Sequence, residues 1–188
     1  GSVIAEYYLQ NRRSVELDAI SPYVRQATVD IEDRRFYQHN GVDPQGIVRA
    51  VFVQLAGGSE GASTITQQLV RNTVLSDEQF EQSLKRKVRE AYIAIQMEKM
   101  YTKDQILNMY LNTIYYGHGA YGIEAASMTY FNKHASDLTL AEAATLSGLP
   151  QSPSAYDPFS NPGAATTRRN LVLDWMLSEG DITQEEHD

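Results

Sequence analysis

Cysteine is absent from the 188-residue chain, which excludes a disulfide framework and a thiol nucleophile. No apolar run approaches the roughly 18 residues that a membrane-spanning helix needs. The motif Ser-x-x-Lys does not occur, so an acyl-serine site built on that motif is excluded. Among the four histidines, His118 and His134 have no companions at metal-ligand spacing. No spacing in the chain therefore defines a metal site.

The charge is acidic overall and basic in one place. The formal net charge is −8 and the sequence pI is near 5.0, which argues against an extended basic groove and against nucleic acid as a partner. A basic cluster between Lys85 and Arg89 still allows a local anion site. The hydrophobic content of 42% is enough for a proper core in a single domain.

The first clear helix signal leads to an acidic pair. Ser21 as N-cap, followed by proline, predicts a helix that delivers Glu32 to a glycine-containing loop. A carboxylate in such a place is half buried and reachable by substrate, which suits general acid or base chemistry. The alternative is that Glu32 and Asp33 pair with the following Arg34 and Arg35 on a solvated surface.

Two further helices differ sharply in polarity. Asp43 and Pro44 open one that is apolar on nearly every side, which fits either a buried core helix or a surface that touches lipid. The next, from Ser63 to Asn72, contains many residues with low helix propensity whose side chains can form hydrogen bonds. Its N-terminus follows glycines and could bind an anion through its free N–H groups. The alternative for it is an ordinary exposed helix with Ser63 as N-cap.

A long helix to Met100 is predicted to start at a capping box of Ser76 and Gln79. Its apolar stripe is expected at Phe80, Leu84, Val88, Ala91 and Ile95, with Arg86, Lys87, Arg89 and Glu90 on or beside the wet face. Arg86 and Glu90 are four residues apart and favour a salt bridge. The functional alternative makes Glu90 a second carboxylate beside a phosphate-binding basic cluster, which suggests glycosyl transfer from a phosphate-linked donor.

The remaining pattern predicts a mainly α fold with one core and no internal repeat. Caps are expected at Thr102 with Gln105 and at Thr139 with Glu142, and Asn161 precedes a last long helix. His39 is interpreted as a structural histidine in a turn. The tyrosines around positions 110 to 121 are interpreted as core and core edge.

Four groups of residues, in order along the chain, resemble the motifs of the peptidoglycan glycosyltransferase family. This family contains the glycan-polymerising domain of class A penicillin-binding proteins and the monofunctional transglycosylases. The groups are Glu32–Phe36 with His39 and Gly41, then Gly61–Leu69, then Arg86–Lys87 with Glu90, and then Lys103–Asn112. The resemblance implies a single lysozyme-like helical domain over residues 1–188, with a smaller membrane-contacting lobe that holds about residues 43–62.

The resemblance also implies a reaction and a role for each matched residue. A growing lipid-pyrophosphate-linked strand is the donor, the 4-hydroxyl of lipid II attacks, and a β-1,4 glycan forms with inversion. Glu32 is implied to be the catalytic general base, and Glu90 is implied to be the second catalytic residue, which assists at the donor side. The implied substrate-binding residues are Asp33, Phe36, His39, Ser63, Thr64, Gln67, Gln68, Arg71, Arg86, Lys87 and Arg89. Arg71 stands where many members have lysine.

The implied partners are lipid II, the lipid-linked glycan strand and a membrane surface. The implied location is the bacterial cell envelope, at the outer face of the cytoplasmic membrane. The sequence requires no cofactor, and a Mg²⁺ or Mn²⁺ ion is compatible with it. Any membrane anchor and any transpeptidase domain of a parent protein are expected outside these residues. Two alternatives stay open, a lysozyme-like peptidoglycan hydrolase and a non-catalytic lipid II-binding module.

Overall fold

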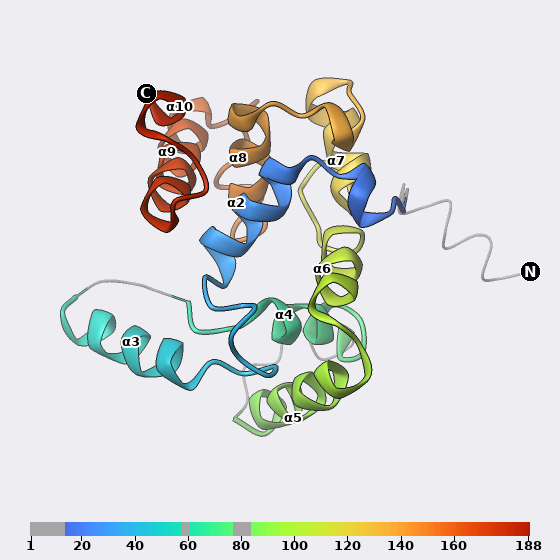
Figure 1. Ribbon diagram of the computed structural model, residues 1–188, viewed down its shortest axis with the longest axis vertical. Helices are drawn as coiled ribbons and strands as arrows, with labels where there is room; N and C mark the ends of the chain where they lie inside the picture. The colour runs from blue at the N-terminus through green and yellow to red at the C-terminus, as the bar shows by residue number, and fades with distance from the viewer. Residues whose placement is uncertain (1–13, 58–60, 77–83) are drawn as a thin grey trace, which may run out of the picture. The chain divides into compact units, whose positions relative to one another are not determined.

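The computed structural model describes residues 14–57, 61–76 and 84–188 (Figure 1). Within these residues the secondary structure is helical, apart from one isolated antiparallel β-bridge between Tyr115 and Tyr121. The predicted mainly α fold is thereby confirmed. The chain divides into two compact units, Gly1–Ile31 with Leu111–Asp188 (unit 1) and Glu32–Tyr110 (unit 2).

Unit 1 packs helices from both ends of the chain around a shared core. A cluster of buried residues joins Ala27, Ala144, Val172 and Met176, and Ser21 Oγ donates to the Leu138 carbonyl oxygen. The predicted caps are confirmed where α8 begins at the Thr139–Glu142 capping box. The elements of this unit are η1 (Leu17–Ala19), α2 (Pro22–Glu32, whose last residue starts unit 2), α7 (Ile123–Phe131), η3 (Ala135–Asp137), α8 (Leu140–Gly148), α9 (Pro162–Glu179) and α10 (Gln184–His187).

Unit 2 contains α3 (Pro44–Leu55), α4 (Ile65–Asn72), α5 (Leu84–Met100) and α6 (Lys103–Leu111, whose last residue belongs to unit 1). Asp43 caps α3 by accepting a hydrogen bond from the Gln45 N–H, as the sequence predicted. The N-cap of α4 is Thr64 and not the expected Ser63, because Thr64 forms a reciprocal capping box with Gln67. Part of the capping box predicted at Ser76 and Gln79 lies outside the described residues.

The N-terminal half of α5 buries the face that the sequence predicted to be exposed to solvent. Leu84, at 82% relative exposure, and Val88 are exposed, whereas Arg86 and Glu90 are buried. The predicted apolar stripe and wet face are therefore wrong for the N-terminal half of this helix. The reason lies in another element, because α4 supplies an arginine to the buried carboxylate and ion pairing makes its burial tolerable.

Helix α3 exposes the apolar side chains that a core helix would bury. Phe52 is 67% exposed and Leu55 is 80% exposed, and Ile47, Val48 and Val51 are exposed as well. Only Gly46 and Ala50 are buried along the helix. The core-helix interpretation is thus wrong, and an apolar surface of this kind marks an interaction site. Among the described residues, no helix combines the length and the hydropathy needed to cross a bilayer.

Candidate active site

Glu32 closes α2 and enters a hydrogen-bonded chain inside unit 2. The side-chain amide of Gln68, on α4, donates a 2.8 Å hydrogen bond to Glu32 Oε2. The buried Tyr110 hydroxyl, on α6, donates a 3.1 Å hydrogen bond to Gln68 Oε1. The carboxylate that sequence singled out is therefore half buried at a helix end and fixed by side chains from two other helices.

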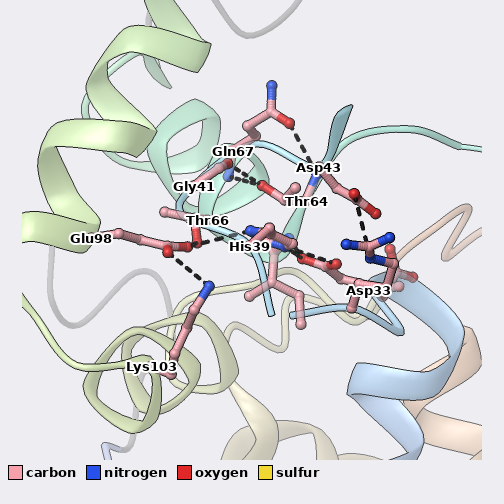
Figure 2. Close-up of polar contacts among 12 residues, drawn as sticks. Asp33, His39, Gly41, Asp43, Thr64, Thr66, Gln67, Glu98 and Lys103 are labelled. Atoms are coloured by element: carbon pink, nitrogen blue, oxygen red, sulfur yellow. Dashed lines mark hydrogen bonds and ion pairs between the residues drawn. The ribbon is translucent and has the colours of Figure 1, made fainter. Parts of the chain in front are cut away.

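The neighbouring acid, Asp33, has a different environment. It is buried and accepts a 2.8 Å hydrogen bond from His39 Nε2 (Figure 2). It also accepts a 3.0 Å hydrogen bond from the Ile65 N–H. Ile65 is the first residue of α4, so this carboxylate satisfies an N–H group that a helix N-terminus leaves open. The alternative of a solvated pair with the following arginines is wrong for Asp33, and Arg35 approaches Asp43 at 3.6 Å instead.

A third acid, Glu98, whose side chain is only 4% exposed, continues the same network (Figure 2). It accepts a 2.6 Å hydrogen bond from Thr66 Oγ1 and pairs with Lys103 Nζ at 2.7 Å. His39 Nδ1 lies 3.9 Å from Glu98, so the imidazole stands between two carboxylates. The Lys103 ammonium also lies 4.5 Å from the centre of the Phe36 ring, a cation–π distance. The interpretation of His39 as structural fits these contacts.

Gly41 allows the first loop to lie directly on α5. Its φ is +89°, and a Cβ there would stand 2.7 Å from backbone atoms of Ala94 and Ile95. Only glycine fits both conditions without strain. The Gly41 carbonyl then accepts a 2.7 Å hydrogen bond from Thr64 Oγ1, which ties this loop to the start of α4.

Glu90 lies at the centre of a basic cluster. Its side chain is fully buried and is contacted by Arg71 Nε at 3.0 Å, Arg86 Nη1 at 3.0 Å and Lys87 Nζ at 2.7 Å. The predicted Arg86–Glu90 salt bridge is confirmed. Ser63 Oγ accepts hydrogen bonds from both Arg71 and Lys87. Three cations around one carboxylate leave two positive charges in excess, which suits a bound dianionic group.

The ionisation of Glu90 reflects this cluster. Burial raises the pKa of the Glu90 carboxyl, but hydrogen bonds and positive charge from Arg71 and Lys87 lower it more, so that the pKa lies below its usual value. Glu90 is consequently a carboxylate near neutral pH. It serves as the fixed counter-charge that holds the three cations together.

Helix α4 brings the two candidate catalytic carboxylates to one helix face. Gln68 contacts Glu32 and Arg71 contacts Glu90. These two α4 residues are three positions apart, so they are neighbours on one face, about 4.5 Å apart along the axis. The sequence does not reveal that Glu32 and Glu90 share a scaffold, and the structure does.

The transglycosylase family model matches residues 1–177 of the chain. The chain belongs to the transglycosylase family. It is 50% identical to penicillin-binding protein 1A of Escherichia coli K12 over 190 residues, which cover 100% of this chain and 22% of the relative. It is 45% identical to penicillin-binding protein 1F of Bacillus subtilis 168, over 99% of this chain and 26% of the relative. The chain thus spans about a quarter of the length of these relatives.

The fold agrees with a solved structure. The crystal structure of penicillin-binding protein 1A from Haemophilus influenzae matches with a TM-score of 0.58 and 26% identity, over 95% of this chain and 17% of that one. The fold of this chain thus agrees with that of part of a penicillin-binding protein. Nothing in the comparisons favours the hydrolase or the lipid II-binding module.

Several of the predicted substrate-binding residues make contacts within the protein itself. Their side chains are buried and hold other protein groups, as described for Asp33, His39, Thr64, Gln67 and Phe36. Ser63, Gln68, Arg71 and Lys87 remain partly accessible, while Arg89 is exposed one position away from Glu90 on α5. Within the described residues, no group of three or more acidic, histidine or cysteine side chains is arranged to hold a metal ion.

Three contributors to the site were assigned no role in it from the sequence, although Thr66 and Tyr110 lie within the quoted motifs. Glu98 and Thr66 meet across 32 positions in the chain, and no local pattern predicts their contact. Tyr110 was interpreted as core, which its burial confirms, but its hydroxyl was not assigned a partner. A buried tyrosine hydroxyl usually finds a hydrogen-bond partner, so that rule was the available signal.

Proposed function

We propose that this domain polymerises lipid II into β-1,4 glycan strands, with Glu32 as the general base and the cations around Glu90 as the donor pyrophosphate site. The observation that carries the proposal is the joint attachment of Glu32 and of the Glu90 cluster to α4, through Gln68 and Arg71. A base for the attacking hydroxyl and a cationic site for the leaving group are the two parts that this reaction needs.

In the proposed step, one carbon–oxygen bond forms and another breaks at the anomeric carbon of the growing strand. Glu32 removes the proton of the acceptor 4-hydroxyl, whose oxygen forms a bond to the anomeric carbon of the growing strand. The bond from that carbon to the pyrophosphate oxygen breaks, and the lipid pyrophosphate leaves with the electron pair. Attack opposite an α-linked leaving group gives the β-linkage, so the reaction inverts.

Arg71, Arg86 and Lys87 are proposed to stabilise the charge that develops on the departing pyrophosphate. Bidentate recognition by arginine suits phosphate oxygens, and Lys87 adds a point charge at the accessible edge of the cluster. Glu90, which is fully buried, acts through these cations and is a positioning residue in this account. A Mg²⁺ or Mn²⁺ ion remains compatible, because such ions bind substrate phosphates with few protein ligands.

We further propose that the exposed apolar side chains of α3 contact membrane lipid at the outer face of the cytoplasmic membrane in the bacterial cell envelope. Phe52 and Leu55 expose large apolar area, and burying such area against lipid is favourable. Lipid II and a lipid-linked strand would reach the site from that surface. We also propose a transpeptidase domain elsewhere in a longer parent protein, because the relatives are named penicillin-binding proteins and this chain spans only 22% and 26% of them.

The direct test is incubation of the chain with fluorescent lipid II in detergent, with product length read on a gel. Glycan strands longer than the substrate support the polymerase. Shorter products from pre-formed glycan, and none from lipid II, would establish the hydrolase instead. Binding of lipid II without any product would favour the binding module and contradict the proposal.

A further inference from the structure

We propose that Tyr110 is a positioning residue for this reaction, which sets the orientation of the Gln68 amide and through it the placement of the Glu32 carboxylate. This inference rests on the proposed function of Glu32. It starts from the chain of two hydrogen bonds that runs from Tyr110 Oη to Gln68 Oε1 and from Gln68 Nε2 to Glu32 Oε2.

The donor and acceptor types allow only one direction along this chain. A carboxylate only accepts, so the NH₂ end of the Gln68 amide must face Glu32. The carbonyl end then faces Tyr110, whose hydroxyl is the group able to donate to it. With the amide reversed, an oxygen would face the Glu32 carboxylate and repel it.

The Gln68 side chain is the remaining adjustable part, because its backbone is held firmly. The Gln68 N–H donates to the Thr64 carbonyl, and the Gln68 carbonyl accepts from the Asn72 side chain at 2.7 Å. The start of α4 is anchored by the Asp33 carboxylate on the Ile65 N–H. Rotation about the side-chain bonds of Gln68 would move its amide away from Glu32, and the hydrogen bond from the Tyr110 hydroxyl opposes that rotation.

Tyr110 acts at a distance from any substrate. Its side chain is fully buried on α6, so it is not a catalytic residue. A change that removes only the hydroxyl keeps the packing of the ring and should leave substrate binding alone. Misplacing a base raises the barrier to reaction without changing ground-state binding, so the effect is expected in kcat.

The experiment compares lipid II polymerisation by the unaltered chain, by Tyr110→Phe, by Gln68→Ala and by the double variant. Tyr110→Phe should lower kcat about threefold to tenfold, the scale of one hydrogen bond, with KM within about twofold. In the Gln68→Ala background the same change should have no further effect, because its route to Glu32 is gone. Tyr101→Phe, at an exposed tyrosine, is the matched control and should retain full activity.

Several results would overturn the inference. An unchanged kcat in Tyr110→Phe, or a loss that multiplies with that of Gln68→Ala, would show that Tyr110 does not act through Gln68. Thermal unfolding of each variant is measured first, and rates are compared at one temperature below the lowest Tm, so that a loss of folded protein is not mistaken for a loss of kcat. If the unaltered chain makes no strands, the proposed function fails and this inference fails with it.

Discussion

The Thr66 hydroxyl donates a 2.6 Å hydrogen bond to the buried carboxylate of Glu98. This contact joins the first turn of α4 to α5, beside the Asp33 carboxylate that holds the Ile65 N–H. The first turn of α4 is therefore fixed by two acids from different parts of unit 2. Because α4 also carries Gln68 and Arg71, the stability of this turn bears on both halves of the proposed site.

Thr66→Val should destabilise the protein, because it removes a donor from a buried carboxylate while keeping the shape of the side chain. We expect a loss of about 1–3 kcal/mol in the free energy of unfolding, measured by denaturant titration. Thr167→Val, at an exposed threonine on α9, is the matched control and should change stability by less than about 0.5 kcal/mol. Equal stability of the two variants would contradict the role given to this hydrogen bond.

Two substitutions of Arg71 should distinguish the effect of its positive charge on activity from the effect of its guanidinium geometry. Arg71→Lys keeps the positive charge near Glu90 but loses the paired contact of Nε and Nη2 with that carboxylate. We expect it to keep most of the activity, with KM for lipid II raised about threefold, whereas Arg71→Ala should cost about 100-fold in kcat/KM. Steady-state kinetics decide this, and equal losses in the two variants would argue against a pyrophosphate site.

The lowered pKa of Glu90 predicts the pH dependence of folding. A carboxyl whose pKa is lower in the folded protein contributes stability that is fully present above its usual pKa of 4.5 and is lost as the pH falls through the folded value. We expect the free energy of unfolding to fall below pH 4.5 less steeply in Glu90→Gln than in the unaltered chain. Parallel curves for the two proteins between pH 6 and pH 3 would show that Glu90 makes no such contribution.

The apolar surface of α3 predicts binding to lipid vesicles. Replacing Phe52 and Leu55 by serine should reduce co-sedimentation with phospholipid vesicles about tenfold, because two large exposed apolar side chains are lost. Phe159→Ser is the matched control, since Phe159 is similarly exposed but belongs to unit 1. If the control weakens binding as much as the double change, the lipid contact does not lie on α3.

Much of the helical framework was predictable because caps are local signals. The start of α3 at Asp43 and Pro44 and the start of α8 at Thr139 each depend on residues within one turn. The burial of Glu90 was not predictable in this way, since its partner Arg71 lies 19 positions away on another helix. Periodicity alone therefore assigned the wrong face of α5 to the core.

The candidate site likewise combines features that the sequence predicts with features that it does not. The family motifs identified Glu32, Glu90 and most of the residues around them, because the type and order of motif residues can be recognised in the sequence alone. The motifs do not tell which side chains support others, and the structure adds that Thr64 and Gln67, which are predicted to bind substrate, form the capping box of α4. Such roles depend on contacts between separate helices, which only the three-dimensional structure reveals.

The proposed role of Glu32 as general base is tested by the variant Glu32→Gln, which removes the carboxylate but keeps the size of the side chain. Strand synthesis from fluorescent lipid II is measured for this variant and for Glu179→Gln, which changes an exposed glutamate in the same way. We expect a loss of at least about 100-fold in kcat for Glu32→Gln, with lipid II still bound, and full activity for Glu179→Gln. Long strands made by Glu32→Gln at the unaltered rate would contradict the assignment.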